Sequence, residues 1–126
     1  RLPSYCTSLG RVMLASLSPG ELDAYLGRVT LRPFTERTVV SEERLRELLT
    51  ETAQQGYAID DQEDEAGVME IAAPVFDANG AMVLALTAIG SGDQLDANPE
   101  GRLVTSLKRC ADGITQRIGS TASHNP

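Results

Sequence analysis

Residues 67–89 constrain the fold more than any other part of the sequence, because they carry the signature of a β-hairpin. Two runs rich in Val, Ile and Ala, residues 67–76 and 81–89, flank the sequence Asp-Ala-Asn-Gly. Asn-Gly between apolar runs is a strong hairpin signal, since both residues tolerate the positive φ angles of tight turns. Residues 57–60 form a shorter extended run just before them. We therefore expect an antiparallel sheet of two long strands and one short one.

Elsewhere the apolar residues recur at helical spacing, which predicts four helices. We expect these helices at residues 8–17, 18–26, 41–55 and about 99–118. Ser18 begins the second of them as a cap, and Glu21 follows at the spacing of a capping box. Helices, then a hairpin, then a helix indicate an α+β domain over residues 1–119. The polar tail, residues 120–126, is expected to be disordered.

Charge and length limit the partners of such a domain. The chain has 126 residues and a net charge of −7, from 11 basic and 18 acidic side chains. Surfaces that bind nucleic acid are basic, so this chain is not expected to bind DNA by itself. No apolar run approaches the roughly 20 residues that span a bilayer, and no secretory leader is visible. These features favour a cytoplasmic location without membrane contact. Cys6 and Cys110 are far apart and are interpreted as small apolar residues in a reducing compartment.

Six carboxylates and no basic residue fall between Gly56 and Val75: Asp60, Asp61, Glu63, Asp64, Glu65 and Glu70. Their spacing does not match a calcium-binding loop, so no metal site is expected. We interpret the acids of residues 61–65 as a solvated turn. Glu70 differs, because it interrupts an apolar strand and shares a face with Val68 and Ala72. A carboxylate on a buried face is costly unless it is paired, so Glu70 either points to solvent or lines a pocket.

The inventory of catalytic groups argues against an enzyme. The single histidine, His124, lies in the polar tail, and nucleophilic hydrolysis usually needs a positioned imidazole. Residues 90–92, Gly-Ser-Gly, lack the Gly-Lys-Ser/Thr of a phosphate-binding loop. Paired carboxylates act on sugars beside stacking aromatic rings, and aromatic residues make up only 4% of this chain. A carboxylate enzyme dependent on Asp60 remains an alternative, as does an oligomerisation or scaffold domain with a vestigial pocket. No cofactor is expected.

Several long stretches resemble the effector-binding domain of IclR-type bacterial transcriptional regulators, over residues 2–119. They are LPSYCTSLGRVMLASLSPGELDAYL, the pair Arg37-Thr38, LRELLTETAQQGYAIDDQEDEAGVMEIAAPVFDANGAMVLALTAIG and the closing helix. The first stretch is most similar to the branch that controls aromatic-acid and β-ketoadipate catabolism.

The resemblance implies a GAF-like domain, a curved antiparallel sheet flanked by helices, which binds a small organic ligand. In that family an N-terminal winged helix-turn-helix binds DNA, and the protein is a homodimer or tetramer. Measured against the family, this chain lacks the winged helix-turn-helix and the first helix and two strands of the effector domain. It also begins at Arg1 rather than Met, which indicates a piece of a longer protein.

The resemblance also implies an effector pocket with three parts. The first is the loop that leads into the first helix, with Ser8, Leu9 and Gly10. The second is the acidic position after Gly-Tyr, Asp60. The third is a set of facing strand positions: Val68, Glu70, Thr87 and Ile89. Backbone N–H groups at the start of a helix suit a ligand carboxylate. The family usually has a small or thiol side chain in place of Glu70, and often Ser in place of Ile89.

Two acids in the pocket would repel a ligand that is itself an acid. Either Asp60 or Glu70 is therefore protonated, or the ligand is hydroxylated or amine-bearing, or a cation sits between the two carboxylates. Arg11, just inside the first helix, is expected either to neutralise Glu70 or a ligand acid, or to be a surface cation.

Overall fold

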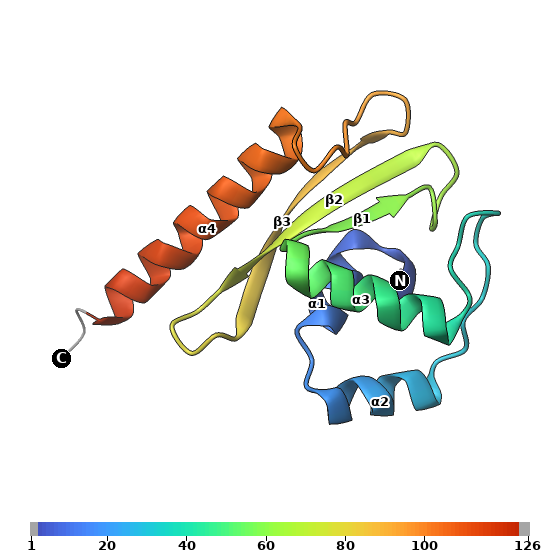
Figure 1. Ribbon diagram of the computed structural model, residues 1–126, viewed down its shortest axis with the longest axis horizontal. Helices are drawn as coiled ribbons and strands as arrows, with labels where there is room; N and C mark the ends of the chain where they lie inside the picture. Colours follow the sequence, from blue (N-terminus) through green and yellow to red (C-terminus); the bar gives the residue numbers. More distant parts are fainter. Residues whose placement is uncertain (1–2, 124–126) are drawn as a thin grey trace.

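The structure describes residues 3–123. They contain four α-helices, one 3-10 helix and three strands, joined by loops. In the computed structural model (Figure 1) they follow one another as η1 (Ser4–Cys6), α1 (Ser8–Ala15), α2 (Pro19–Arg28), α3 (Glu42–Gln55), β1 (Ala58–Asp61), β2 (Val68–Phe76), β3 (Met82–Ser91) and α4 (Arg102–Ser123). This order of helices, antiparallel strands and a closing helix confirms the α+β prediction.

The hairpin predicted around the Asn-Gly sequence is present. The strands form one antiparallel sheet in the order β1-β2-β3, and the turn residue Gly80 has a φ of 81°. The Asp77 carboxylate accepts hydrogen bonds from the backbone N–H groups of Asn79 and Ala81. An Asp side chain that binds its own turn in this way stabilises the reversal of the chain.

The strand register brings the expected pocket positions of the sheet to one face. Glu70 in β2 lies opposite Asp60 of β1 and opposite Ile89 of β3, while Thr87 pairs with Ala72. Paired residues of antiparallel strands point to the same side of the sheet. The short strand, the long strand and the returning strand therefore each place a side chain in one row across the sheet.

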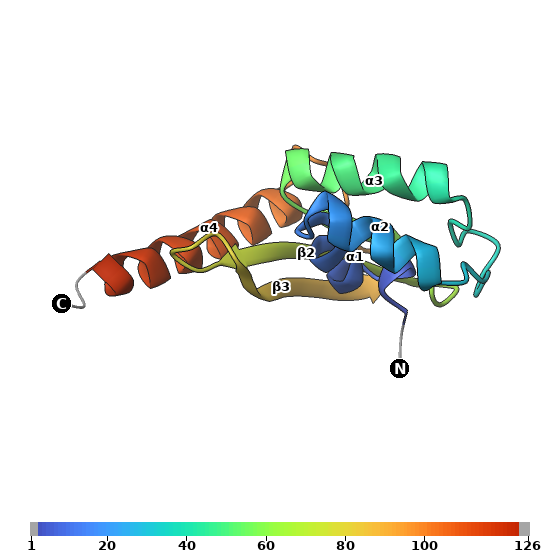
Figure 2. The same cartoon turned by 90° about the horizontal axis from the view of Figure 1, so that it is seen from below.

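Different helices cover the two faces of the sheet (Figure 2). Val104 of α4 packs with Ile71 and Val75 of β2 in one buried cluster. On the opposite face, Val12 of α1 packs with Ala72 of β2. A third buried cluster joins α1 to α2 and α3. Residues of β2 alternate between these faces, so Glu70 faces α1 and not α4.

The start of α2 confirms the predicted capping box. The Ser18 side chain accepts a hydrogen bond from the Glu21 backbone N–H, and the Glu21 carboxylate accepts one from the Ser18 backbone N–H. The Ser41 hydroxyl caps α3 in the same position, and Gly56 ends that helix in the left-handed conformation with a φ of 82°. These caps depend on a few neighbouring residues in the sequence.

Two features of the C-terminal segment differ from what the sequence predicted. Helix α4 continues through Ser123, past its expected end near residue 118 and into the tail that was expected to be disordered. The prediction ended the helix where its apolar stripe ends, but the following residues include no proline before position 126 that would stop it. Residues 124–126, and with them His124, lie outside the described part. Cys110 is exposed on α4 and is not a core residue, whereas Cys6 is buried.

None of the helices within residues 3–123 combines the length and the apolar character needed to cross a membrane.

Candidate functional site

A cavity of about 360 Å³ opens between the N-terminal end of α1 and the face of β2 and β3 that α1 covers. Side chains from three elements and from the segment before α1 line it: Ser4, Thr7, Leu9, Gly10, Met13, Glu70, Thr87 and Ile89. Its volume lies in the range of sites for small organic molecules. The lining is mostly apolar with a few polar groups, the composition that lets such a site select one ligand orientation.

Helix α1 reaches this position because its first turn packs closely against the segment before it. A Cβ atom added at Gly10 would lie 2.2 Å from the backbone carbonyl oxygen of Ser4, so only glycine fits there. The Thr7 hydroxyl accepts a hydrogen bond from the Gly10 N–H at 3.1 Å and caps the helix. The start of α1 is thereby held against η1, with Leu9 and Met13 turned toward the cavity.

Glu70 points into the cavity rather than to bulk solvent. The Ser8 hydroxyl donates a hydrogen bond to Glu70 Oε2 at 3.3 Å, so the carboxylate of the chain itself occupies part of the helix N-terminus. Burial and the nearby Asp64 carboxylate raise the pKa of Glu70, while its hydrogen bonds with Ser8 oppose that rise. The sequence predicted that a ligand carboxylate would bind at the N-terminus of α1, and Glu70 occupies part of that position.

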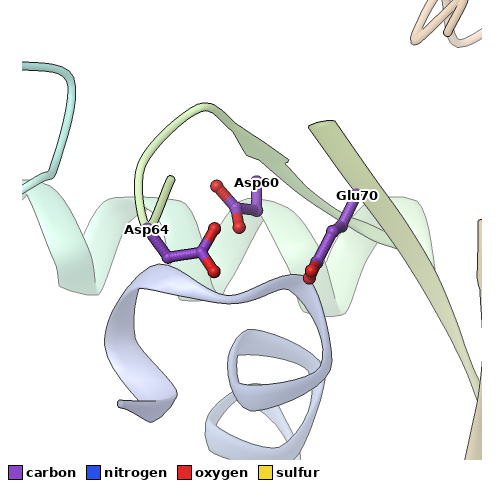
Figure 3. Close-up of side chains that lie close together, drawn as sticks. All are labelled: Asp60, Asp64 and Glu70. Carbon is purple, nitrogen blue, oxygen red and sulfur yellow. The ribbon is translucent and has the colours of Figure 1, made fainter. Parts of the chain in front are cut away.

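Asp60 lies behind Glu70 and is fully buried. Its Oδ1 accepts a hydrogen bond from the Glu63 backbone N–H at 2.8 Å, whereas its Oδ2 has no hydrogen-bond partner. Burial raises the pKa of Asp60 to about 8, and the carboxyls of Asp64 and Glu70 add to the rise. Figure 3 shows the Asp60 and Asp64 carboxyl groups turned toward each other, with Glu70 beside them above the segment that leads into α1.

The structure corrects the predictions for Arg11 and Glu63. Arg11 is 3% exposed and is therefore neither a surface cation nor a partner of Glu70. Its guanidinium binds both carboxylate oxygens of Glu63, one of them at 2.7 Å, and donates to the backbone carbonyls of Tyr5 and Ile59. Glu63 is buried with it, not solvated in the turn. The hydroxyl of Thr38 donates to the Glu63 carbonyl and holds this part of the turn against the core.

Five of the predicted pocket residues line the cavity: Leu9, Gly10, Glu70, Thr87 and Ile89. Ser8 joins them through its bond to Glu70, and Asp60 lies next to Glu70 in the strand row. Val68 is not among the lining residues, because it pairs with Ser91 at the far end of the sheet.

Sequence reasoning missed Ser4, Thr7 and Met13. Met13 lies one helical turn after Leu9 and could have been found from that spacing, whereas Ser4 depends on the packing of η1.

Comparison with known proteins shows which family this chain resembles. The family model described as "Bacterial transcriptional regulator IclR C-terminal" matches residues 1–116. The Pca regulon regulatory protein of Pseudomonas putida is 43% identical over 86 residues, which are 68% of this chain and 30% of that protein. The transcriptional regulator XynR of Escherichia coli K12 is 31% identical over 122 residues, 97% of this chain and 48% of that protein. The chain thus spans less than half the length of these relatives.

Solved structures agree with the family match. A transcriptional regulator from Rhodococcus sp. RHA1 superimposes with a TM-score of 0.88 and 36% identity, over 95% of this chain and 49% of that one. A double mutant of the PobR inducer-binding domain from Acinetobacter, in complex with 3-hydroxybenzoic acid, gives a TM-score of 0.84 and 27% identity. That match covers 91% of this chain and 66% of the other.

Proposed function

Because the chain belongs to the IclR C-terminal family of bacterial transcriptional regulators, we propose that it senses a small-molecule effector for such a regulator. The effector class that best suits the cavity is a small organic or aromatic acid. The domain acts without catalysing a reaction, and it affects DNA only through an N-terminal winged helix-turn-helix joined to it in a longer cytoplasmic protein.

The cavity beside α1 is the observation that carries this proposal. Its apolar wall includes Leu9, Met13 and Ile89, which suit an aromatic or aliphatic ligand body. Its polar end combines Thr87 with the N-terminus of α1, where unpaired backbone N–H groups favour a ligand anion. The PobR domain, whose structure holds 3-hydroxybenzoic acid, gives a parallel for ligand size and class.

A ligand in this cavity contacts two elements at once, α1 and the β2–β3 hairpin. It would therefore favour one relative arrangement of helix and sheet over another, by as much as its affinity for the two arrangements differs. We propose that the regulator is a homodimer or tetramer, and that this bias changes the spacing of its DNA-binding heads.

The test is a thermal-shift screen of the protein against aromatic acids and β-ketoadipate-type dicarboxylates. A ligand at 100 times its Kd stabilises a protein by about 2.7 kcal/mol, which raises the Tm by several degrees. The variant Glu70→Ala should change the Kd of any acid that stabilises the parent, because Glu70 lines the cavity. Glu65→Gln is the matched control, since it removes an exposed carboxylate outside the cavity.

Two results would count against the proposal. If no acid raises the Tm, the scaffold alternative gains support. If Glu70→Ala and Glu65→Gln leave the Kd of a stabilising acid equally unchanged, that acid binds elsewhere on the protein.

A further inference from the structure

Three carboxylates from separate places in the chain converge beside the cavity. Asp60 belongs to β1, Asp64 to the turn after it and Glu70 to β2. Each offers one carboxylate oxygen to a group in which all three atoms lie within 4.8 Å of one another (Figure 3). By sequence Asp64 belongs to a turn expected to be solvated, so this group is a product of the tertiary fold.

Two oxygens of this group lack the partners that buried oxygens normally have. Asp60 Oδ2 and Asp64 Oδ1 are both shielded from solvent and accept no hydrogen bond within the described chain. The Asp60 side chain as a whole is 0% exposed and turned toward the group. Native proteins leave few buried polar atoms without a partner, and a bound water or ion is among the groups that satisfy those that the protein itself does not. This observation is separate from the clustering of the acids.

The three acids also lack a balancing positive charge. None of the ion pairs found among residues 3–123 includes Asp60, Asp64 or Glu70. Arg11, the buried cation of this region, already binds both oxygens of Glu63. A group of acids with this environment attracts a cation more strongly than an exposed group does.

We propose that Asp60, Asp64 and Glu70 together bind one divalent cation. Oxygen-only donor sets select hard cations such as Ca²⁺, Mn²⁺ and Mg²⁺ over softer ones. Around Ca²⁺, with bonds of about 2.3–2.6 Å, two ligand oxygens are at most about 5 Å apart, which the observed group satisfies. Three carboxylates leave coordination positions free for water or for a ligand.

The cation would change what the cavity can recognise. Glu70 is shared between the two features, since it lines the cavity and belongs to the acid group. A divalent ion held there lowers the negative charge of this wall and has free coordination positions, to which the carboxylate of an acid effector can bind. This consequence rests on the proposed function, whereas the cation site itself does not.

The test is a calorimetric titration of chelator-stripped protein with MnCl₂ and, separately, with CaCl₂, in the absence of any organic acid. We expect one site per chain for at least one of the two ions. Asp64→Asn should weaken binding at least tenfold because it removes one ligand, while Glu65→Gln, in the same turn but exposed, should leave the affinity unchanged. The Mn²⁺ titration is repeated by electron paramagnetic resonance, which counts bound and free ion directly.

Asp60→Asn removes another of the three ligands, so it should weaken ion binding as Asp64→Asn does. If Asp64→Asn does not fold, Glu70→Gln takes its place.

The site is refuted if neither ion binds the parent, or if Asp64→Asn and Glu65→Gln bind equally well. The acid screen, run with and without the ion, separates this outcome from failure of the proposed function. Acid binding without any ion binding leaves the sensor and removes the cation site. Ion binding with no acid binding in either condition supports the cation site and counts against the sensor.

Discussion

Asp60 is a fully buried acid on the face of the sheet that α1 covers. One of its oxygens has no hydrogen-bond partner, and burial raises its pKa from 3.8 to about 8. In the unfolded chain the same carboxyl titrates near its ordinary value. Between about pH 4 and pH 8, therefore, the folded protein holds a proton that the unfolded protein has lost.

This difference has a definite sign for stability. Because the folded state binds more protons in that window, the free energy of unfolding of ion-free protein falls as pH rises from about 4 to about 8 and levels off above it. In Asp60→Asn the amide oxygen can still accept from the Glu63 N–H, but the group no longer titrates. We expect the variant to gain stability relative to the parent across this window, by a few kcal/mol at its upper end.

Urea denaturation in the presence of a chelator, at a series of pH values, measures the effect. Asp61→Asn is the control, because Asp61 is half-exposed and pairs with Arg37 at the surface. Its pH profile should follow that of the parent. Parallel profiles for Asp60→Asn and the parent would mean that Asp60 is ionised in the folded protein.

At the scale of elements, the placement of α1 decides whether the cavity exists. The helix has only 8 residues, and a helix of that length is marginal by itself. Its position is set by the Thr7 cap, by the close approach of Gly10 to Ser4 and by the Arg11 guanidinium, which binds η1, β1 and the acidic turn. Contacts from distant segments therefore hold the helix in place.

Gly10→Ala tests whether the close contact with Ser4 positions α1. The added methyl group would meet the Ser4 backbone at 2.2 Å, so the helix or η1 must move. Overpacking of this kind costs about 1–3 kcal/mol, and we also expect weaker binding of any effector, because both segments line the cavity. Urea denaturation measures the first effect and the thermal-shift assay the second.

Gly27→Ala is the matched control for that variant. Gly27 lies in α2, and a Cβ there meets nothing within 4 Å. Alanine favours a helix over glycine by up to about 1 kcal/mol, so this variant should be as stable as the parent or more so. Equal stability of the Gly10→Ala and Gly27→Ala proteins would contradict the close contact at Ser4.

At the scale of the whole molecule, the sheet has a long edge strand that carries exposed apolar side chains. Strand β3 is at the end of the strand order, and Val83, Leu84 and Ile89 are 50%, 43% and 65% exposed. Unpaired edge strands with apolar side chains attract further chain segments. In the 126-residue chain this edge is open to pairing with a second copy.

The 126-residue chain, studied alone, should therefore associate with itself in a concentration-dependent way. The double variant Val83→Lys, Leu84→Lys should weaken the association at least tenfold, because charged side chains protect an edge strand from pairing. Val40→Lys is the control, since Val40 is 47% exposed but lies outside the sheet. Analytical ultracentrifugation measures both. A parent that stays monomeric over the accessible concentration range would remove β3 as an assembly surface.

Local sequence patterns determined the elements of this domain. Helix caps, the Asn-Gly turn and the spacing of apolar residues all act over a few residues. They therefore predicted the helices and the hairpin, and the alternation of side chains along the strand placed Glu70 on a defined face. The family resemblance covered nearly the whole chain and predicted five of the residues that line the cavity. These features follow from short-range rules, or from many positions matched in order.

Only the tertiary structure decided how the charged side chains are paired. Arg11 and Glu63 are 52 positions apart in the chain, and no local pattern joins them. Because Arg11 is committed to Glu63, Glu70 is left with the Ser8 hydroxyl, and Asp60 and Asp64 come together with no ion pair to a Lys or Arg side chain among residues 3–123. A buried charge is stabilised by whatever group the fold brings within a few ångströms, and that distance depends on the packing of distant segments rather than on the neighbours of the residue in the sequence.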